Sequence, residues 1–147
     1  GALMKTFLAI SLAILLAGLG YMLSQGSDDT ADLVTGNSVV GGPLADVVLP
    51  DALSEAARIG KQAFTAKCAD CHGANAQGQR GVAPPLVHVI YEPGHHGDES
   101  FQRAVSSGVR AHHWPFGNMP PVDGMTRGDV AMIVAYIREL QRANGIN

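Results

Sequence analysis

The residues with the clearest chemical potential lie in one short stretch, A-K-C-A-D-C-H-G at positions 66–73. It contains both cysteines of the 147-residue chain, Cys68 and Cys71, and His72 follows the second cysteine directly. Thiolates and imidazoles act as nucleophiles, redox groups and metal ligands. The spacing therefore predicts redox chemistry, a metal site or the covalent attachment of a cofactor.

Three uses of a Cys-x-x-Cys pair fit this sequence poorly. A thioredoxin-type redox site needs a surrounding βαβ pattern, which is missing, and a zinc site needs a second ligand pair at finger spacing. A local disulfide would close a very small loop and add little stability. A fourth use includes the histidine, because C-x-x-C-H is the attachment pattern of c-type haem. We therefore expect one haem c, bound covalently through Cys68 and Cys71, with His72 on the iron.

Met119, in the loop sequence F-G-N-M-P-P-V, is the candidate for the second axial ligand. The two prolines after it prevent a helix and stiffen the loop, which suits a thioether held over a metal. A methionine ligand raises the reduction potential of haem iron. The alternatives are two other methionines and two histidines: Met125, Met132, His112 and His113.

Two pairs of histidines precede this methionine, His95 with His96 and His112 with His113. We expect them to be solvated or hydrogen-bonding loop residues near the haem edge, with Trp114 as part of the haem wall. A second metal site, for instance for copper with imidazole ligands, is one alternative. A pH-dependent docking surface is another.

The elements that must position these groups are helices joined by loops rich in glycine and proline. An alanine-rich segment predicts a helix that begins at Asp51 or Ser54 as its cap and runs into Cys68. A short helix is expected over residues 99–107, started by Asp98 and stopped by glycine at position 108.

The last helix has the clearest signals. Thr126 and Asp129 have the form of a capping box, and Gly145 lies beyond the expected end. Apolar residues follow the cap at helical spacing: Val130, Ile133, Val134, Ile137 and Leu140. No segment predicts a strand, so the fold class is expected to be all-α.

The N-terminal part reads as a membrane anchor. Residues 7–23 carry no charge and are almost wholly apolar, and with their flanks (about 6–24) they would form a helix of roughly 28 Å, close to the hydrocarbon thickness. A cleaved signal peptide is the alternative, but small residues at cleavage spacing are poorly placed. We expect residues 1–24 to be an uncleaved anchor, with Lys5 placing the N-terminus in the cytoplasm.

Residues 25–50 read as an acidic, glycine-rich linker, and residues 51–147 as the folded domain. A flexible tether is the expected state of the linker, although apolar pairs such as Val47-Val48 leave open a strap that lies along a partner protein. The net charge of −3 offers no basic field for nucleic acid. Basic and acidic residues are equal in number within 51–147.

Residues 51–147 resemble class I c-type cytochromes. The resemblance rests on five short sequences: C-A-D-C-H at 68–72, A-P-P-L at 83–86, S-G-V at 107–109, N-M-P at 118–120 and V-A-Y-I at 134–137. It implies a class I cytochrome c fold in which the first and last helices cross, with Gly60 and Phe64 meeting Tyr136. It also implies that the Pro84 carbonyl accepts the ring N–H of His72, although Ala83 stands where the family usually has glycine.

The resemblance further implies an electron carrier without a small-molecule substrate, since iron between His72 and Met119 has no open position. An anchor ahead of such a domain is similar to membrane-tethered bacterial carriers. These pass single electrons from a quinol–cytochrome c reductase to a haem–copper oxidase or a photosynthetic reaction centre. We therefore expect a single-pass protein of the bacterial cytoplasmic membrane with a periplasmic haem domain. The alternatives are a fixed haem c subunit of a larger respiratory oxidase, reductase or dehydrogenase, and an enzyme or gas sensor with a labile sixth ligand.

Overall fold

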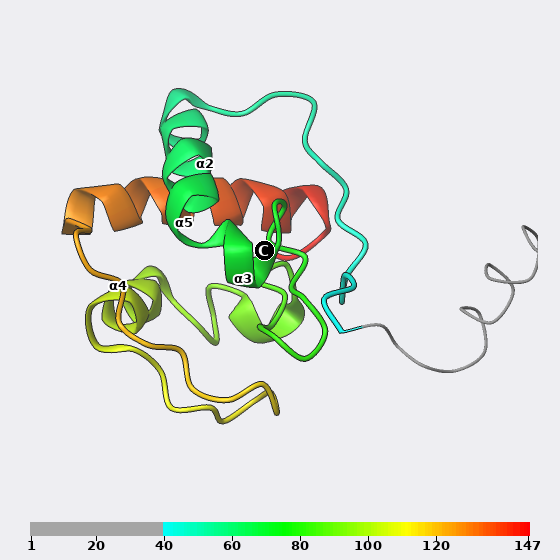
Figure 1. Ribbon diagram of the computed structural model, residues 1–147. Coiled ribbons are helices and arrows are strands. Elements are labelled where there is room, and N and C mark those ends of the chain that lie inside the picture. Colours follow the sequence, from blue (N-terminus) through cyan, green and yellow to red (C-terminus); the bar gives the residue numbers. More distant parts are fainter. Residues whose placement is uncertain (1–39) are drawn as a thin grey trace, which may run out of the picture. The chain divides into compact units, whose positions relative to one another are not determined.

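The computed structural model describes residues 40–147, so the expected anchor and residues 25–39 of the expected linker lie outside the described residues. The elements follow in the order α2 (Glu55–Lys67), α3 (Ala69–His72), the 3₁₀ helix η1 (Val89–Tyr91), α4 (Asp98–Ser107) and α5 (Arg127–Ala143) (Figure 1). Within residues 40–147, strand pairing is limited to isolated bridges. The expected all-α class is therefore confirmed for this part of the chain. None of its helices has both the length and the apolar character that crossing a membrane requires.

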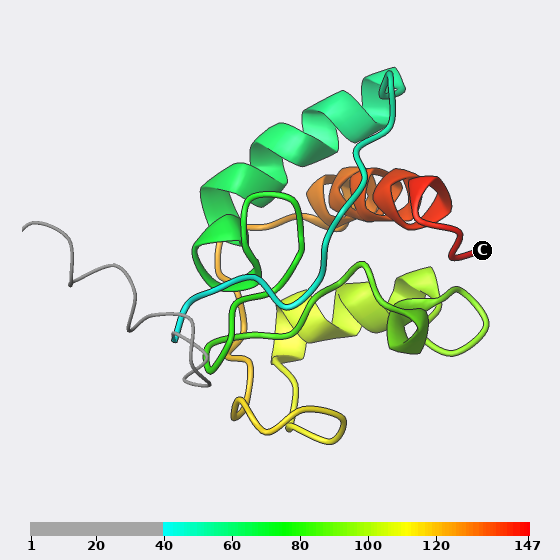
Figure 2. The same ribbon diagram turned by 90° about the vertical axis from the view of Figure 1, so that its right-hand side faces the viewer.

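Helices α2 and α5 cross at the centre of the domain, as both views show (Figures 1 and 2). Gly60 allows the close approach, because a Cβ placed on it would lie only 1.8 Å from the carbonyl oxygen of Met132. Farther along the crossing, the rings of Phe64 and Tyr136 pack at 5.6 Å between centroids and an interplanar angle of 60°. The expected contact of Phe64 with Tyr136 is confirmed, and a Cβ placed on Gly60 would meet Met132 and Ile133.

Both long helices begin at side-chain caps. The Ser54 hydroxyl accepts a hydrogen bond from the Ala57 N–H, so Ser54 rather than Asp51 caps α2. In α5 the Thr126 hydroxyl accepts from the Asp129 N–H at 3.2 Å, and the Asp129 carboxylate accepts from the Thr126 N–H at 2.9 Å. The predicted capping box is thus confirmed. The predicted apolar face of α5 is buried at every position: Val130, Ile133, Val134, Ile137 and Leu140.

Helix α4 begins one residue earlier than predicted. Gly97 occupies the cap position, and no side chain caps the helix. The prediction that Asp98 is the cap is wrong, because its carboxylate accepts a hydrogen bond from Nε of Arg138 in α5 at 2.9 Å. The predicted stop at Gly108 is confirmed. The Asp98 side chain, which the local sequence pattern assigned to the helix cap, thus forms a long-range ion pair with Arg138 instead.

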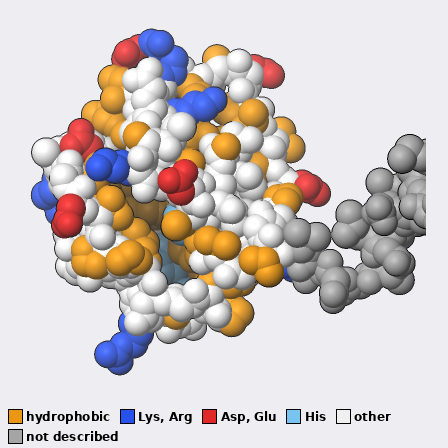
Figure 3. Space-filling view, in the orientation of Figure 1, with side chains coloured by type: hydrophobic (Ala, Val, Ile, Leu, Met, Phe, Trp, Pro, Cys, Tyr) orange, Lys and Arg blue, Asp and Glu red, His pale blue; other side chains and the backbone are white. Residues whose placement is uncertain are grey.

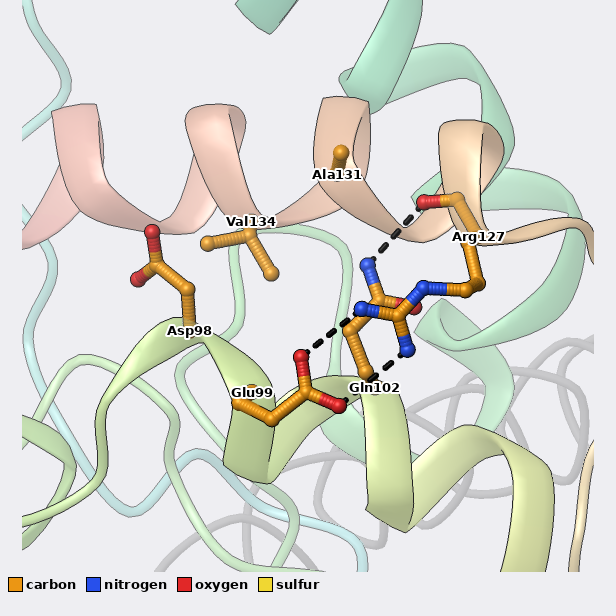
Figure 4. A pocket seen from close by; sticks show the side chains of 6 residues that line it. All are labelled: Asp98, Glu99, Gln102, Arg127, Ala131 and Val134. Carbon is orange, nitrogen blue, oxygen red and sulfur yellow. Dashed lines mark hydrogen bonds and ion pairs between the residues drawn. The ribbon is translucent and has the colours of Figure 1, made fainter.

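Polar side chains hold α4 against the N-terminal half of α5. The Arg127 guanidinium donates to both carboxylate oxygens of Glu99, at 3.1 and 2.8 Å, and Gln102 donates to the Arg127 carbonyl at 3.0 Å (Figure 4). These residues line a pocket together with Asp98, Ala131 and Val134. Neither cysteine nor any histidine lines this pocket, so we assign it a structural role in joining α4 to α5.

Residues 40–50, here called the strap, run along the folded domain (Figure 2). The Arg80 N–H donates to the Gly42 carbonyl at 2.8 Å, and Val47 packs against the hydrophobic core. The amide of Asn144 bonds both main-chain groups of Val48, at 2.9 and 2.8 Å. Sequence analysis assigns this segment to the linker, but in the structure it contacts the chain's own domain because its main-chain groups find partners there.

Candidate functional site

Cys68 and Cys71 lie one helical turn apart at the junction of α2 and α3. Cys68 ends α2 and begins α3, and its carbonyl accepts the N–H groups of Cys71 and His72 at 3.2 and 2.9 Å. Both cysteines are free thiols, Cys68 half-buried and Cys71 exposed. Burial, with a smaller effect of the neighbouring Cys71, raises the pKa of Cys68 to about 11. The turn presents two thiols and one imidazole within five consecutive residues.

His72 is held by a hydrogen bond from its ring. Its Nδ1 lies 2.9 Å from the Pro84 carbonyl oxygen, which can only accept, so Nδ1 carries the proton and Nε2 keeps its lone pair. Burial lowers the pKa of His72, and the bond to Pro84 partly opposes this effect. The ring is therefore neutral at pH 7 and can bind a metal through Nε2. The bond that the resemblance implies is present.

The Pro84 carbonyl is positioned by close backbone packing. Gly78 donates its N–H to the His72 carbonyl at 2.7 Å, and a Cβ on Gly78 would lie 2.4 Å from the nitrogen of Pro85. Gly78 also has φ +72°, a conformation that suits glycine. Ala83 has no such positive φ. Alanine is therefore accommodated where related proteins usually have glycine.

Met119 lies in a loop that is fixed to the end of α4. Met119 and Val109 exchange two main-chain hydrogen bonds, of 2.9 and 3.0 Å. Gly108 lies so close that a Cβ on it would be 2.5 Å from the Met119 carbonyl oxygen. The rival Met125 packs against the hydrophobic core, and Met132 lies within α5. Met119 is therefore the methionine that is best placed to act as a ligand.

The surroundings of His72 and the two cysteines fit a large ligand that is mostly apolar and also carries carboxylate groups. A space-filling view shows a hollow between α3 and α4, with hydrophobic side chains around it and histidine deep inside (Figure 3). Burial raises the pKa of Tyr91 and the nearby Trp114 side chain partly opposes this, but the buried indole N–H of Trp114 makes no hydrogen bond of normal length among residues 40–147. Such a donor costs about 1–3 kcal/mol when it stays unsatisfied. A haem propionate would supply the missing acceptor, so the residues present fit the group that the sequence predicts.

Trp114 was expected as part of the haem wall, but its need for an acceptor was not predictable from the sequence. The indole ring stacks on Phe116 at 10° between planes and meets His88 edge-on at 5.1 Å between centroids. The ring is half-buried, and its buried N–H has no hydrogen-bond partner of normal length among the described residues. Burial of one atom depends on the folded loops, and no local sequence signal reports it.

The structure brings the two histidine pairs together. Nε2 of His95 lies 3.4 Å from Nε2 of His113, and the rings of His112 and His113 are 4.2 Å apart between centroids. Partial desolvation lowers the pKa of His113, and the neighbouring imidazoles of His112, His96 and His95 lower it further. The cluster is distinct from the His72 site, because it is built from the turn before α4 and the loop after it.

The comparisons with known proteins agree with the geometry of the site. The family model described as Cytochrome c matches residues 57–141, which is more than half of the chain and includes the C-A-D-C-H sequence and the Met119 loop. No curated protein matches the chain.

Proposed function

Because the chain belongs to the cytochrome c family, we propose that it is a membrane-tethered electron carrier with one covalent haem c. The bound haem supplies one-electron exchange between the ferric and ferrous states of its iron. The observation that carries the proposal is the His72–Pro84 hydrogen bond of 2.9 Å beside two free thiols one turn away. It supports the role of His72 as a metal ligand, because the bond leaves Nε2 free beside two groups that can form thioethers.

Each residue of the site has a separate task. Cys68 and Cys71 would hold the macrocycle through two thioether bonds, and His72 would bind the iron through Nε2. The Pro84 carbonyl keeps the proton on Nδ1 of His72, which fixes the tautomer and the ring orientation. The hydrophobic hollow excludes water from the group, and Trp114 would donate its N–H to a propionate.

Met119 would fill the second axial position. Its main chain is bonded to Val109, and two prolines follow it, so the loop has little freedom to withdraw the thioether. If His72 and Met119 both bind the iron, no position would be open for oxygen or another substrate. The arrangement supports electron transfer and disfavours an enzyme or a gas sensor with a labile ligand.

The tether belongs to residues 1–24, which lie outside the described residues. Their uncharged apolar run supports an anchor in the bacterial cytoplasmic membrane, with the N-terminus cytoplasmic and the haem domain periplasmic. A tether raises the effective concentration of partners in the same membrane. The partners we propose are a quinol–cytochrome c reductase as donor and a haem–copper oxidase or photosynthetic reaction centre as acceptor.

A fixed haem c subunit of a larger oxidoreductase is the second candidate. The strap favours it in one respect, because Val40, Val48 and Leu49 remain 74, 63 and 48% exposed although they are apolar. Such side chains suit a contact with another protein. The strap's bonds to its own domain do not depend on such a contact, and they suit a free carrier equally well.

Expression in a bacterium that matures c-type cytochromes tests the proposal. The full chain is expected in the membrane fraction with covalent haem, and replacement of residues 1–24 by a cleavable signal peptide is expected to release a soluble periplasmic haem protein. Full-length protein that is soluble would contradict the tether. Purification in mild detergent then separates the two candidates, because a stoichiometric complex with other subunits would replace the free carrier.

A further inference from the structure

Three imidazoles outside the haem site meet at the surface of the domain. His95 and His96 come from the turn between η1 and α4, and His113 comes from the loop between α4 and α5. One ring nitrogen of each lies within 4.8 Å of the others. We propose that these three histidines bind a divalent transition-metal ion, with Cu²⁺ bound more tightly than Zn²⁺. This site goes beyond the proposed electron transfer and does not depend on it.

The distance between two of the nitrogens suits a shared metal better than a hydrogen bond. Nε2 of His95 and Nε2 of His113 are 3.4 Å apart. Hydrogen bonds from a ring nitrogen are usually about 2.9–3.0 Å long. Two nitrogens bound to one tetrahedral ion at about 2.0–2.1 Å each are roughly 3.3 Å apart. The pair therefore already has the separation of two ligands on one ion, and both side chains are exposed and free to adjust.

His96 is fixed in the way that metal-binding histidines usually are. Its Nδ1 lies 2.5 Å from the Ile90 carbonyl, so this nitrogen carries the proton and Nε2 keeps its lone pair. Its main-chain N–H donates to the Glu92 carbonyl at 2.8 Å, and its own carbonyl accepts from Arg138 at 2.6 Å. One bond thus fixes the ring and two fix the main chain of His96, so that Nε2 is held in position for a metal ion.

The third ligand is carried by a loop that is also anchored. The amide oxygen of Asn118 accepts the Ala111 N–H at 2.9 Å, which closes the loop that carries His113. The adjacent His112 bonds the Arg110 carbonyl through Nδ1 at 2.8 Å and does not belong to the group of three. His112 therefore provides a matched control, because it is equally exposed and directly next to a proposed ligand.

The donor set decides which ions fit. Three imidazole nitrogens without a thiolate or carboxylate suit Cu²⁺, Zn²⁺ and Ni²⁺ and disfavour Mg²⁺ and Ca²⁺, which prefer oxygen ligands. Affinity for such sites rises toward Cu²⁺ and falls again at Zn²⁺. Three protein ligands leave one position for water. The bound ion should therefore exchange with ions in solution, unlike an ion in a structural site with four protein ligands.

Metal titration of the full-length ferric holoprotein tests the proposal. After treatment with a chelator, the protein is titrated with Cu²⁺ alone and with Zn²⁺ alone, in competition with a chelating dye. We expect one ion per chain in addition to iron, and nitrogen couplings in the electron paramagnetic resonance spectrum of bound Cu²⁺. His95→Ala and His113→Ala should each weaken Cu²⁺ binding by more than about 30-fold. Loss of a group that only supports a metal ligand usually costs about 10–100-fold in affinity, and loss of the ligand itself should cost at least a similar factor.

The control variant makes the result specific. His112→Ala should change Cu²⁺ affinity by less than about threefold. The haem absorption spectrum reports the fold of every variant, so a loss of metal binding is distinguishable from a failure of the haem site. Absence of stoichiometric binding at micromolar Cu²⁺ would overturn the proposal. An equal loss in His112→Ala and His113→Ala would also overturn it, since this would indicate diffuse binding to exposed imidazoles.

Discussion

Gly60 of α2 lies directly against the main-chain carbonyl of Met132 in α5, so close that a Cβ on Gly60 would be 1.8 Å from the oxygen and 2.4 Å from the carbon. No side-chain movement can relieve this overlap, because the obstructing atoms are backbone. The crossing of the two helices, and with it the contact of Phe64 with Tyr136, therefore depends on glycine at this position.

Gly60→Ala should destabilise the holoprotein by about 3 kcal/mol, the upper range for overpacking in a core. Gly128→Ala is the matched control in α5, because a Cβ there would lie at an ordinary 3.6 Å from the Thr126 hydroxyl. It should be neutral or stabilising by up to about 1 kcal/mol. Urea unfolding followed by helical circular dichroism measures both, and equal stability of the two variants would show that the crossing tolerates a side chain.

Gly108→Ala should displace Met119 without preventing haem attachment. A Cβ on Gly108 would lie 2.5 Å from the Met119 carbonyl, whereas a Cβ on Gly124, which has a similar φ of +75°, would meet nothing within 4 Å. Gly124→Ala therefore places alanine at a similarly positive φ without the collision. The reduced Gly108→Ala protein is expected to bind carbon monoxide and the Gly124→Ala protein is not. If neither binds, Gly108 does not position the ligand.

Arg138→Met should destabilise the domain by about 2–3 kcal/mol. The buried guanidinium donates to the carbonyls of His96 and Tyr91, both at 2.6 Å, and the Tyr91 carbonyl keeps a second donor from Gln141. The main cost is then two acceptors left without this donor: the part-buried His96 carbonyl and the buried side-chain oxygen of Gln141, which also accepts from Arg138 at 2.6 Å. Arg142→Met is the control, because its ion pair with Glu139 is 4.0 Å long and 56% exposed on the arginine side, so less than about 0.5 kcal/mol is expected. A similar loss in both variants, measured by urea unfolding, would assign the effect to charge instead of to the hydrogen bonds.

Electron transfer with a membrane partner should depend weakly on ionic strength. The basic and acidic residues of 51–147 are equal in number, and four of the arginines already pair with carboxylates of the same domain. Strong electrostatic steering of a partner requires a protein surface whose charges are mostly of one sign. We expect the rate to change by less than about threefold between roughly 20 and 200 mM salt. A tenfold fall in stopped-flow measurements would indicate a charged docking face.

Local signals in the sequence predicted the parts of the fold that local interactions stabilise. The capping box of Thr126 and Asp129 and the apolar spacing of α5 fixed that helix correctly, because both depend on residues within one or two turns. The start of α4 was misplaced for the opposite reason. The carboxylate of Asp98 bonds Arg138, 40 residues away, and no local pattern reports such a partner.

The same distinction holds for the candidate sites. The C-A-D-C-H sequence is contiguous, so its chemistry is visible before the fold is known. The histidine pairs were visible too, but the 3.4 Å approach of His95 to His113 depends on how two loops close around α4. The bonds between Asn144 and Val48 likewise join residues 96 positions apart. Features of this kind require coordinates.

Carbon monoxide binding to the reduced full-length holoprotein tests the central claim most directly, because the account assigns His72 and Met119 to the same iron as its two protein ligands. The absorption spectrum of the native protein should stay unchanged under carbon monoxide, while Met119→Ala should bind one equivalent per haem. Prompt binding of one equivalent by the native protein would contradict the account, since it would show an open or labile sixth position.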